Sequence, residues 1–292
     1  MRIFDPHIHM TSRTTNDYEA MYAAGVRALV EPAFWLGQPR TNVGSFLDYF
    51  DSLVGWERFR AAQFGIRHHA TIALNPKEAN DPRCREVLSE IPRYLLKDGV
   101  VAVGEVGYDS MTPEEDEVFA QQMQMALDAE LPVLVHTPHR DKLAGTRRTL
   151  DVVRESGVPA EMVLVDHLNE TNVELVLESG AWAGFSIYPD TKMDPDRMVS
   201  ILSEYGLDRM IVNSAADWGR SDPLKTLAAG KAMLAAGFSE DDVDRVLWRN
   251  PVEFYAQSNN LILDPVPGFQ PGEPPAAGVE FEGSSVLRGP RK

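Results

Sequence analysis

The sequence has one cysteine, Cys84, in 292 residues. An intramolecular disulfide and a cysteine-rich zinc site are therefore excluded, and a reducing compartment is the natural setting. No apolar run approaches the roughly 20 residues that span a bilayer. The first residues, MRIFDPH, also lack the apolar stretch of a signal peptide. We therefore expect a cytoplasmic protein that does not enter membranes.

Positive charge is also scarce, because 28 Lys and Arg stand against 44 Asp and Glu and give a formal net charge of −16. Such a surface repels phosphate backbones and anionic lipids, so long nucleic acid and membranes are disfavoured partners. Hydrophobic residues make up 43% of the chain and charged residues 25%, which is typical of a globular protein with one large core. An anionic ligand would have to be small and held by a local group of cations.

Eight short apolar or β-branched runs predict strands. They lie at 2–5, 27–31, 69–74, 100–105, 132–136, 162–167, 181–185 and 210–213. Most lack an apolar–polar alternation, which indicates a parallel sheet covered on both faces. Helical periodicity follows at 44–62, 82–97, 114–129, 145–156, 169–179, 194–205 and 221–236, and a last helix at 239–257 is expected to cover the outside. The pattern predicts an α/β fold, a single (β/α)₈ TIM barrel over residues 1–258.

The composition changes after the predicted barrel. From Asp264 onward Pro and Gly recur so often that no helix is expected. We interpret 259–292 as a tail that is either extended over a surface or disordered, with 279–282 and 286–288 as docking points. Such a tail could serve a homo-oligomer or a partner protein.

Four of the seven histidines fall at predicted strand ends. His7 and His9 follow the first strand two residues apart, a spacing that turns both imidazoles to the same face. His136 ends the fifth strand and His167 the sixth. Because TIM-barrel active sites lie at the carboxyl ends of the strands, these side chains are expected to meet at one mouth. The pair at 68–69 lies at the opposite end of its strand and is expected to be structural.

Two carboxylates join these histidines. Glu105 ends a buried apolar run and Asp217 follows the eighth strand, and a buried carboxylate is costly unless it is paired or bound to metal. An H-x-H pair alone can arise by chance, and a strand-end carboxylate alone is more often a helix cap. All six at one mouth predict a metal site, with Zn²⁺ favoured, Mn²⁺ or Ni²⁺ as alternatives and Mg²⁺ less suited.

The residues around these positions resemble the TatD family of metal-dependent hydrolases, within the amidohydrolase superfamily. The resemblance covers 1–258 and rests on five motifs in the family's order: FDPHIH at 4–9, GEVGYD at 104–109, PVLVH at 132–136, VDH at 165–167 and DW at 217–218. Three departures leave the substrate open. Asn75 stands before Pro76 where many members carry a His, and NSAAD at 213–217 replaces a TDSP-type ending. The end of the sixth strand, DHLNE at 166–170, lacks the aromatic and Gly residues common in relatives.

The resemblance implies a centre of two divalent metals. His7, His9 and Asp217 would bind one metal, His136 and His167 the other, and Glu105 would bridge them. It also implies hydrolysis, in which a bridging water of lowered pKa attacks a carbonyl or phosphorus. Asp217 would take up the proton and pass it to the leaving group.

Substrate specificity is expected in the loops after the strands, which hold many of the chain's cations. Those loops carry Arg13, Arg40, His139, Arg140, Lys142, Lys192 and Arg220. They predict a small anionic substrate, a phosphoester, amide or lactone. Arg140 is the strongest candidate, since a guanidinium grips phosphate or carboxylate with two hydrogen bonds. The other residues expected to contact substrate are His139, Arg220, Trp218 and Arg40.

Other interpretations remain open at this point. The acidic residues Asp17, Asp141, Asp190 and Asp222 lie near the loop cations and could simply pair with them. Phe34 and Trp35 could form a lid or pocket wall, or pack under the next helix. The alternative functions are a TatD-type deoxyribonuclease, a metal-dependent lyase or isomerase, and a pathway partner that docks through its tail.

Overall fold

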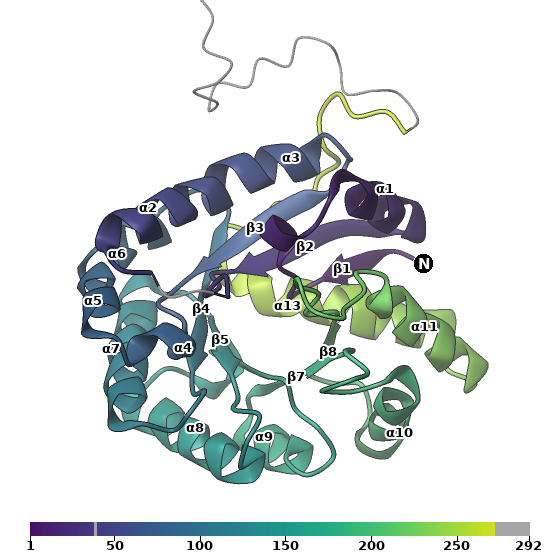
Figure 1. Cartoon of the computed structure of the whole chain (residues 1–292). Coiled ribbons are helices and arrows are strands. Elements are labelled where there is room, and N and C mark those ends of the chain that lie inside the picture. Colours follow the sequence, from purple (N-terminus) through teal and green to yellow (C-terminus); the bar gives the residue numbers. More distant parts are fainter. Residues whose placement is uncertain (38–39, 272–292) are drawn as a thin grey trace, which may run out of the picture.

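A computed structural model describes residues 1–37 and 40–271, in which eight parallel strands form a nearly closed barrel inside a layer of helices (Figure 1). The strands pair in chain order: β1 Ile3–Asp5, β2 Val26–Pro32, β3 Arg67–Ile72, β4 Val100–Gly107, β5 Val133–His136, β6 Val163–Asp166, β7 Trp182–Ser186 and β8 Met210–Asn213. Between β8 and β1 the chain is joined by two backbone hydrogen bonds, from Ala215 N to His7 O (2.9 Å) and from His9 N to Ala216 O (2.9 Å). The TIM-barrel prediction is confirmed.

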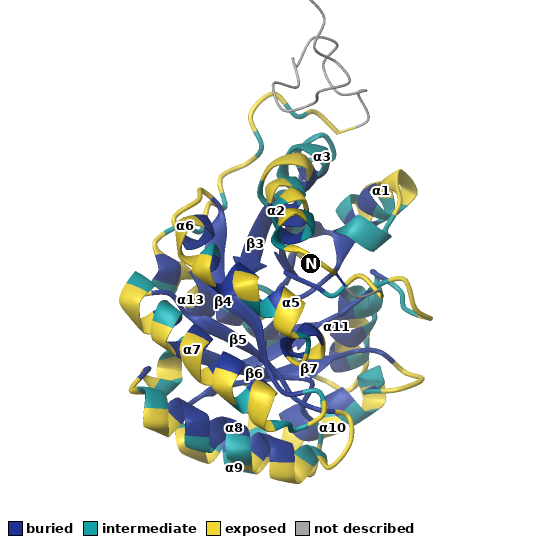
Figure 2. Cartoon of the chain, turned by 60° about the vertical axis from the view of Figure 1, so that its left-hand side comes forward, coloured by how far each residue is buried: buried dark blue, intermediate teal, exposed yellow. Residues whose placement is uncertain are grey.

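Apart from α13, the helices lie outside the barrel and bury the side that faces the strands, while their outer sides are exposed (Figure 2). They are α1 Thr15–Ala24, α2 Val43–Asp51, α3 Arg58–Ala62, α4 Pro76–Ala79, α5 Pro82–Arg85, α6 Ile91–Leu95, α7 Pro113–Ala129, α8 Lys142–Ser156, α9 Val173–Ser179, α10 Pro195–Tyr205, α11 Lys225–Ala235, α12 Glu240–Asp244 and α13 Asn250–Tyr255. Within the described residues, no helix is both long and apolar enough to cross a membrane.

Helix α1 was missing from the prediction. Its low content of apolar residues hides the helical period, but its start carries a local signal. The Asp17 side chain accepts a hydrogen bond from the backbone N–H of Thr14 (2.8 Å), three residues earlier. This Thr-x-x-Asp spacing is a variant of the capping box and marks the helix start.

The last predicted helix, 239–257, covers the outside only with its first part, where Val246 and Leu247 pack in the core cluster beside β1 and β8. Its second part, α13, turns to the inside. Phe254 and Tyr255 of α13 are fully buried and join an inner cluster with side chains from the strands, among them Phe4 and Leu164. The Tyr255 hydroxyl donates to the carbonyl of Pro6 (2.9 Å). The apolar aromatic face of α13 therefore closes the inside of the barrel, because only there can both rings leave water.

The described part of the predicted tail, 259–271, lies against the barrel. The backbone N–H of Ile262 donates to His69 Nε2 (3.1 Å), and the Arg67 guanidinium donates to the carbonyl of Asp264 (2.6 Å). These contacts lie at the start of β3, the end opposite to the site. The predicted docking points, 279–282 and 286–288, lie outside the described residues.

The buried carboxylate of Glu31, on β2, holds the loop that carries His9. Glu31 of β2 accepts from the backbone N–H of Thr11 (2.7 Å) and contacts His68 Nε2 (2.8 Å). Burial raises the pKa of Glu31 to about 7 and lowers the pKa of His68 to about 3. The structural role expected for His68 agrees with this contact.

Glu31→Gln is expected to make folding less sensitive to pH. The Glu31 pKa is higher in the folded than in the unfolded chain, so its contribution is fully present below the unfolded value and is lost as pH rises through about 7. Gln keeps an acceptor for Thr11 and a donor for His68. The stability of the variant relative to the parent should rise by on the order of 2–3 kcal/mol between pH 4.5 and pH 8. Urea unfolding at both pH values measures this, with exposed Glu19→Gln as control. An unchanged difference would contradict the burial argument.

Candidate active site

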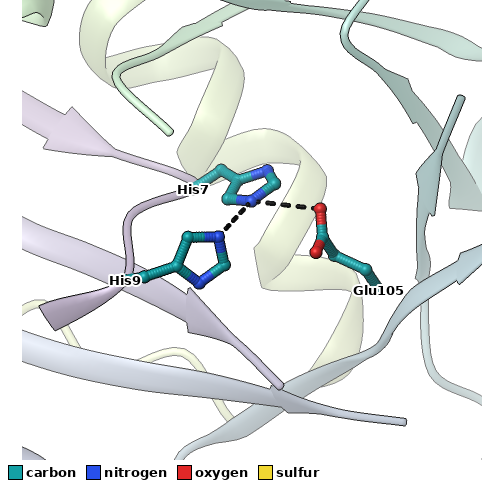
Figure 3. Close-up of side chains that lie close together, drawn as sticks. All are labelled: His7, His9 and Glu105. Atoms are coloured by element: carbon teal, nitrogen blue, oxygen red, sulfur yellow. Dashed lines mark hydrogen bonds and ion pairs between the residues drawn. The ribbon is translucent and has the colours of Figure 1, made fainter. Parts of the chain in front are cut away.

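Glu105 lies at the centre of the barrel mouth, surrounded by four histidines. Its Oε1 is 3.2 Å from His7 Nε2, 3.4 Å from His136 Nδ1 and 3.4 Å from His167 Nε2. His9 Nε2 lies 3.2 Å from His7 Nε2, and Figure 3 shows His7 between His9 and Glu105. All five residues are buried. Five of the six predicted metal ligands are thus brought together from β1, β4, β5 and β6.

The geometry of this cluster suits divalent metal ions. Two groups of potential ligand atoms, His7–His9–Glu105 and Glu105–His136–His167, share the Glu105 carboxylate. His9 Nδ1 and His136 Nε2 are buried without a hydrogen-bond partner in the described part of the chain. Imidazole nitrogens with one shared carboxylate are a donor set that Zn²⁺ and similar ions favour. The residues present therefore fit the metals that the sequence predicts.

The charges within the cluster are strongly coupled. Burial alone would raise the pKa of Glu105, but the neighbouring His7, His136 and His167 outweigh it and hold that pKa well below its usual range. Burial, followed by the charge of His7, lowers the pKa of His9 to about 3. Glu105 is thus held ionised and His9 neutral, the forms in which they ligate metals. Although burial opposes it, Glu105 and Asp166 raise the pKa of His7, so a metal bound at His7 would displace a proton.

Asp166 was not singled out from the sequence, although it orients two of the histidines. Its Oδ2 accepts from His7 Nδ1 (2.6 Å), and its Oδ1 accepts from the backbone N–H of His167 (2.7 Å). The Asn213 amide nitrogen lies 3.0 Å from both oxygens. The hydrogen bond from Nδ1 leaves His7 Nε2 free to bind a ligand toward Glu105. The sequence signal was the Asp-His pair at the end of a buried strand.

Asn75 explains one departure from the family pattern. Its side-chain amide donates to Glu105 Oε2 (3.1 Å), while its own oxygen accepts from the backbone N–H of Lys77 at the start of α4 (3.1 Å). Asn75 therefore orients Glu105 from the side opposite to the histidines. A side chain with both a donor and an acceptor can make these two contacts at once.

Asp217 is the predicted ligand that the structure does not bring into the cluster. It belongs to none of the ligand groups in the described residues. Its Oδ1 accepts from the backbone N–H of Gly219 (2.7 Å) and from the Tyr188 hydroxyl (3.1 Å). Because Asp217 follows the end of β8 by four residues, loop conformation and not strand geometry sets its position. It lies at the rim of the mouth, partly exposed.

Trp218 belongs to an aromatic wall beside His9. Phe34 stacks on the His9 ring with centroids 3.8 Å apart, and Trp218 lies 4.7 Å from Phe34 and 5.7 Å from Trp35. Trp218 remains 46% exposed. These three aromatic residues, Phe34, Trp35 and Trp218, form one side of the mouth, which agrees with the pocket-wall alternative.

Arg40 takes a different place from the one expected. Its guanidinium is buried, donates to Glu78 (2.7 Å) and to the carbonyl of Phe34 (2.7 Å), and lies over the Tyr49 ring. The structure therefore corrects the expectation of a substrate contact, since the ion pair with Glu78 already uses this cation to pack the loop after β2.

The other predicted substrate contacts lie on the exposed rim. His139, Arg140 and Arg220 are exposed, and the His139 ring lies 6.0 Å from the His136 ring. No hydrogen bond or ion pair holds the Arg140 or Arg220 side chain in the described ranges. Their role in substrate binding stays a prediction.

Comparisons with known proteins agree with this geometry. The family model for TatD-related DNases matches residues 4–255. An uncharacterised metal-dependent hydrolase of Methanocaldococcus jannaschii is 24% identical over 87% of this chain and 99% of its own length. A TatD-like protein of Archaeoglobus fulgidus has a TM-score of 0.73 at 25% identity, covering 86% of this chain and 99% of that one.

A more distant structure shares the fold. The phosphotriesterase homology protein of Escherichia coli, with phosphate in its active site, has a TM-score of 0.63 at 17% identity, covering 87% of this chain and 98% of that one. From the match to the family model, together with the buried histidine–glutamate cluster, we conclude that this chain belongs to the TatD-related DNase family and is a metal-dependent hydrolase.

Proposed function

We propose that the protein is a hydrolase with two divalent metals, Zn²⁺ foremost, that acts on a small anionic substrate. The observation that carries the proposal is the position of Glu105 Oε1 within 3.4 Å of ring nitrogens from three histidines. One carboxylate shared by two ligand groups is the arrangement that holds two ions close together.

Each residue of the cluster has its own task. His7 and His9 would hold one ion, His136 and His167 the other, and Glu105 would bridge them. Bound metals would supply Lewis acidity and a water whose pKa is lowered to about 7. Asp217, at the rim and hydrogen-bonded to Tyr188, would accept a proton and return it to the leaving group. The aromatic wall would line the substrate pocket and limit the access of water.

The proposal is tested by metal content and product chemistry. Full-length protein is purified, its metals are counted by mass spectrometry, and a panel of phosphoesters, amides and lactones is assayed with and without chelator. Hydrolysis in ¹⁸O-labelled water should place the label in the product. Activity that resists chelation, or a product without label, would overturn the proposal, and an unlabelled product would favour a lyase or isomerase.

Asp217→Asn separates the two roles predicted for Asp217. If the residue carries protons, kcat should fall by about 10²–10⁴-fold while two metals remain bound. If it is a ligand, metal content should fall with activity. Because Asp217 lies outside the ligand groups, we expect the first result. Exposed Asp196→Asn on α10 is the matched control.

The name of the family makes a deoxyribonuclease the second candidate. The net charge of −16 argues against a long polyanion, because nucleic-acid binding is driven by protein cations that neutralise phosphates and release counterions. Incubation of metal-replete protein with single-stranded DNA distinguishes the two. Rapid degradation that Asp217→Asn removes would favour the nuclease over the small-substrate hydrolase.

A further inference from the structure

Several cations around the barrel mouth are paired with carboxylates. Four such pairs are Arg13–Asp17, Arg40–Glu78, Lys77–Asp109 and Arg197–Glu170. Within residues 1–37 and 40–271, Arg140 and Arg220 are unpaired but exposed, whereas Lys142 and Lys192 are unpaired and partly buried. Across the described ranges, neither ammonium has a carboxylate within ion-pair distance, although both are partly buried.

Lys142 points into the mouth from the first residue of α8. Its Nζ donates to the backbone carbonyl of His167 (2.6 Å) and to Thr137 Oγ1 (3.1 Å). Thr137 Oγ1 in turn donates to the carbonyl of Asp166 (2.7 Å). All the acceptors are neutral, so no carboxylate of the described chain contacts the Lys142 ammonium, and Asp166 acts on its charge only from a distance.

Lys192 is presented by a short loop after β7. The backbone N–H of Lys192 donates to the carbonyl of Tyr188 (2.8 Å), and that of Tyr188 donates to Met193 O (2.8 Å). Arg197 fixes the loop from outside by donating to the carbonyl of Lys192 (2.8 Å). The loop therefore fixes the place of this ammonium, whose Nζ lies 3.2 Å from His167 Nδ1. Asp166, Glu105 and Asp217 attract the Lys192 charge without lying within ion-pair distance of it.

The contact of Lys192 with His167 depends on one proton. His167 Nδ1 also lies 2.6 Å from Ser186 Oγ, and Nε2 faces Glu105. A ligand at Nε2 requires the neutral ring to carry its proton on Nδ1, which then donates to Ser186. Nδ1 can no longer accept from Lys192 in that tautomer. The Lys192 ammonium is then available to an anionic ligand.

We propose that Lys142 and Lys192 form an anion subsite beside His167, and that this subsite binds a phosphate group of the substrate. The inference rests on the proposed function, because it assigns the substrate class of the same site. Both ammonium groups contact one residue of the cluster, so a group held between them would lie next to the reacting centre.

The chemistry of the pair favours phosphate. Two lysines are compact point charges with several donors each, and they match a dianion with oxygens directed to different sides. A carboxylate is gripped better by the planar fork of an arginine. Among the described residues, the Arg40 guanidinium is already paired with Glu78, and those of Arg140 and Arg220 are exposed on the rim. A phosphomonoester, or inorganic phosphate as product, therefore fits the subsite.

The test measures phosphate binding, not turnover. Inorganic phosphate is titrated calorimetrically into the full-length protein as purified, with its metal content recorded. Lys142→Met and Lys192→Met keep the length of the side chains and remove the charge. Each should raise the Kd for phosphate by about tenfold or more, the size expected for one charge-assisted hydrogen bond. Lys77→Met, whose ammonium is paired with Asp109, is the matched control and should leave the Kd unchanged.

The possible outcomes separate this inference from the proposed function. A Kd that the two variants leave unchanged, at equal metal content and equal thermal stability, would overturn the subsite. An equal weakening in Lys77→Met would also overturn it, because general charge would then explain binding. Weakened phosphate binding in the two variants would support the subsite even if the hydrolase panel gave no activity, since the titration does not depend on catalysis.

Discussion

Glu105→Gln is expected to remove both metals from the site and to lower hydrolysis by at least about 10³-fold, because the metal-lowered pKa of water is lost with them. Glu105 Oε1 faces three histidine nitrogens and Oε2 accepts from Asn75. Gln has only one oxygen. If that oxygen faces the histidines, the amide N–H groups of Gln face the amide N–H groups of Asn75. The neutral side chain also lacks the charge that two cations require.

Metal analysis after gel filtration and kcat on the best substrate measure this effect. Exposed Glu117→Gln on α7 is the matched control and should retain metals and activity. Circular dichroism checks that the variant folds. A folded Glu105→Gln protein with two metals and ordinary kcat would contradict the central role of this carboxylate.

Asp166→Asn should weaken metal binding by about 10–100-fold, the usual effect of changing the partner of a ligating histidine. The neighbours of Asp166 described above, His7 Nδ1, the backbone N–H of His167 and the Asn213 amide, all donate. An amide nitrogen placed among them faces another donor whichever way it turns. His7 is then released from the orientation that directs Nε2 toward Glu105.

Competition with a chromophoric chelator gives the metal affinity, and the same variant tests whether Asp166 acts through position. Excess metal should restore much of kcat in Asp166→Asn, while Glu105→Gln should stay inactive. Asp151→Asn, at a partly exposed position on α8, is the control. Unchanged metal affinity would show that Asp166 only packs the barrel. Gly184→Ala offers an independent check, since a Cβ at 184 would lie 2.6 Å from Asp166 Oδ1 and would displace the carboxylate.

Local chemistry made the barrel and most of its metal cluster predictable. Strands such as 210–213 were recognisable because side chains buried on both faces must be apolar along their whole length. His7, His9, His136 and His167 follow such strands closely, so the ends of the strands determine where they lie. Helix α1 was missed because its polar surface weakens the hydrophobic period.

The position of a loop residue was beyond this reasoning. Asp217 and Arg40 lie several residues past their strands, where each added residue multiplies the backbone conformations available to the chain. Sequence reasoning placed Arg40 at the substrate, which the structure corrects, and Asp217 at a metal, which stays a prediction for the Asp217→Asn test. Backbone turns and long-range partners, Tyr188 for Asp217 and Glu78 for Arg40, decide where they lie.

The sequence by itself determined the barrel, the family and a mouth that joins four histidines to Glu105, because the period of the strands and the order of the motifs carry that information locally. Only the tertiary structure decided which loop cations are free to meet a ligand. Arg40 is neutralised by a carboxylate 38 residues away, whereas Lys142 and Lys192 meet neutral acceptors on His167. Whether a charge is balanced depends on contacts between distant segments, and those exist only in the folded chain.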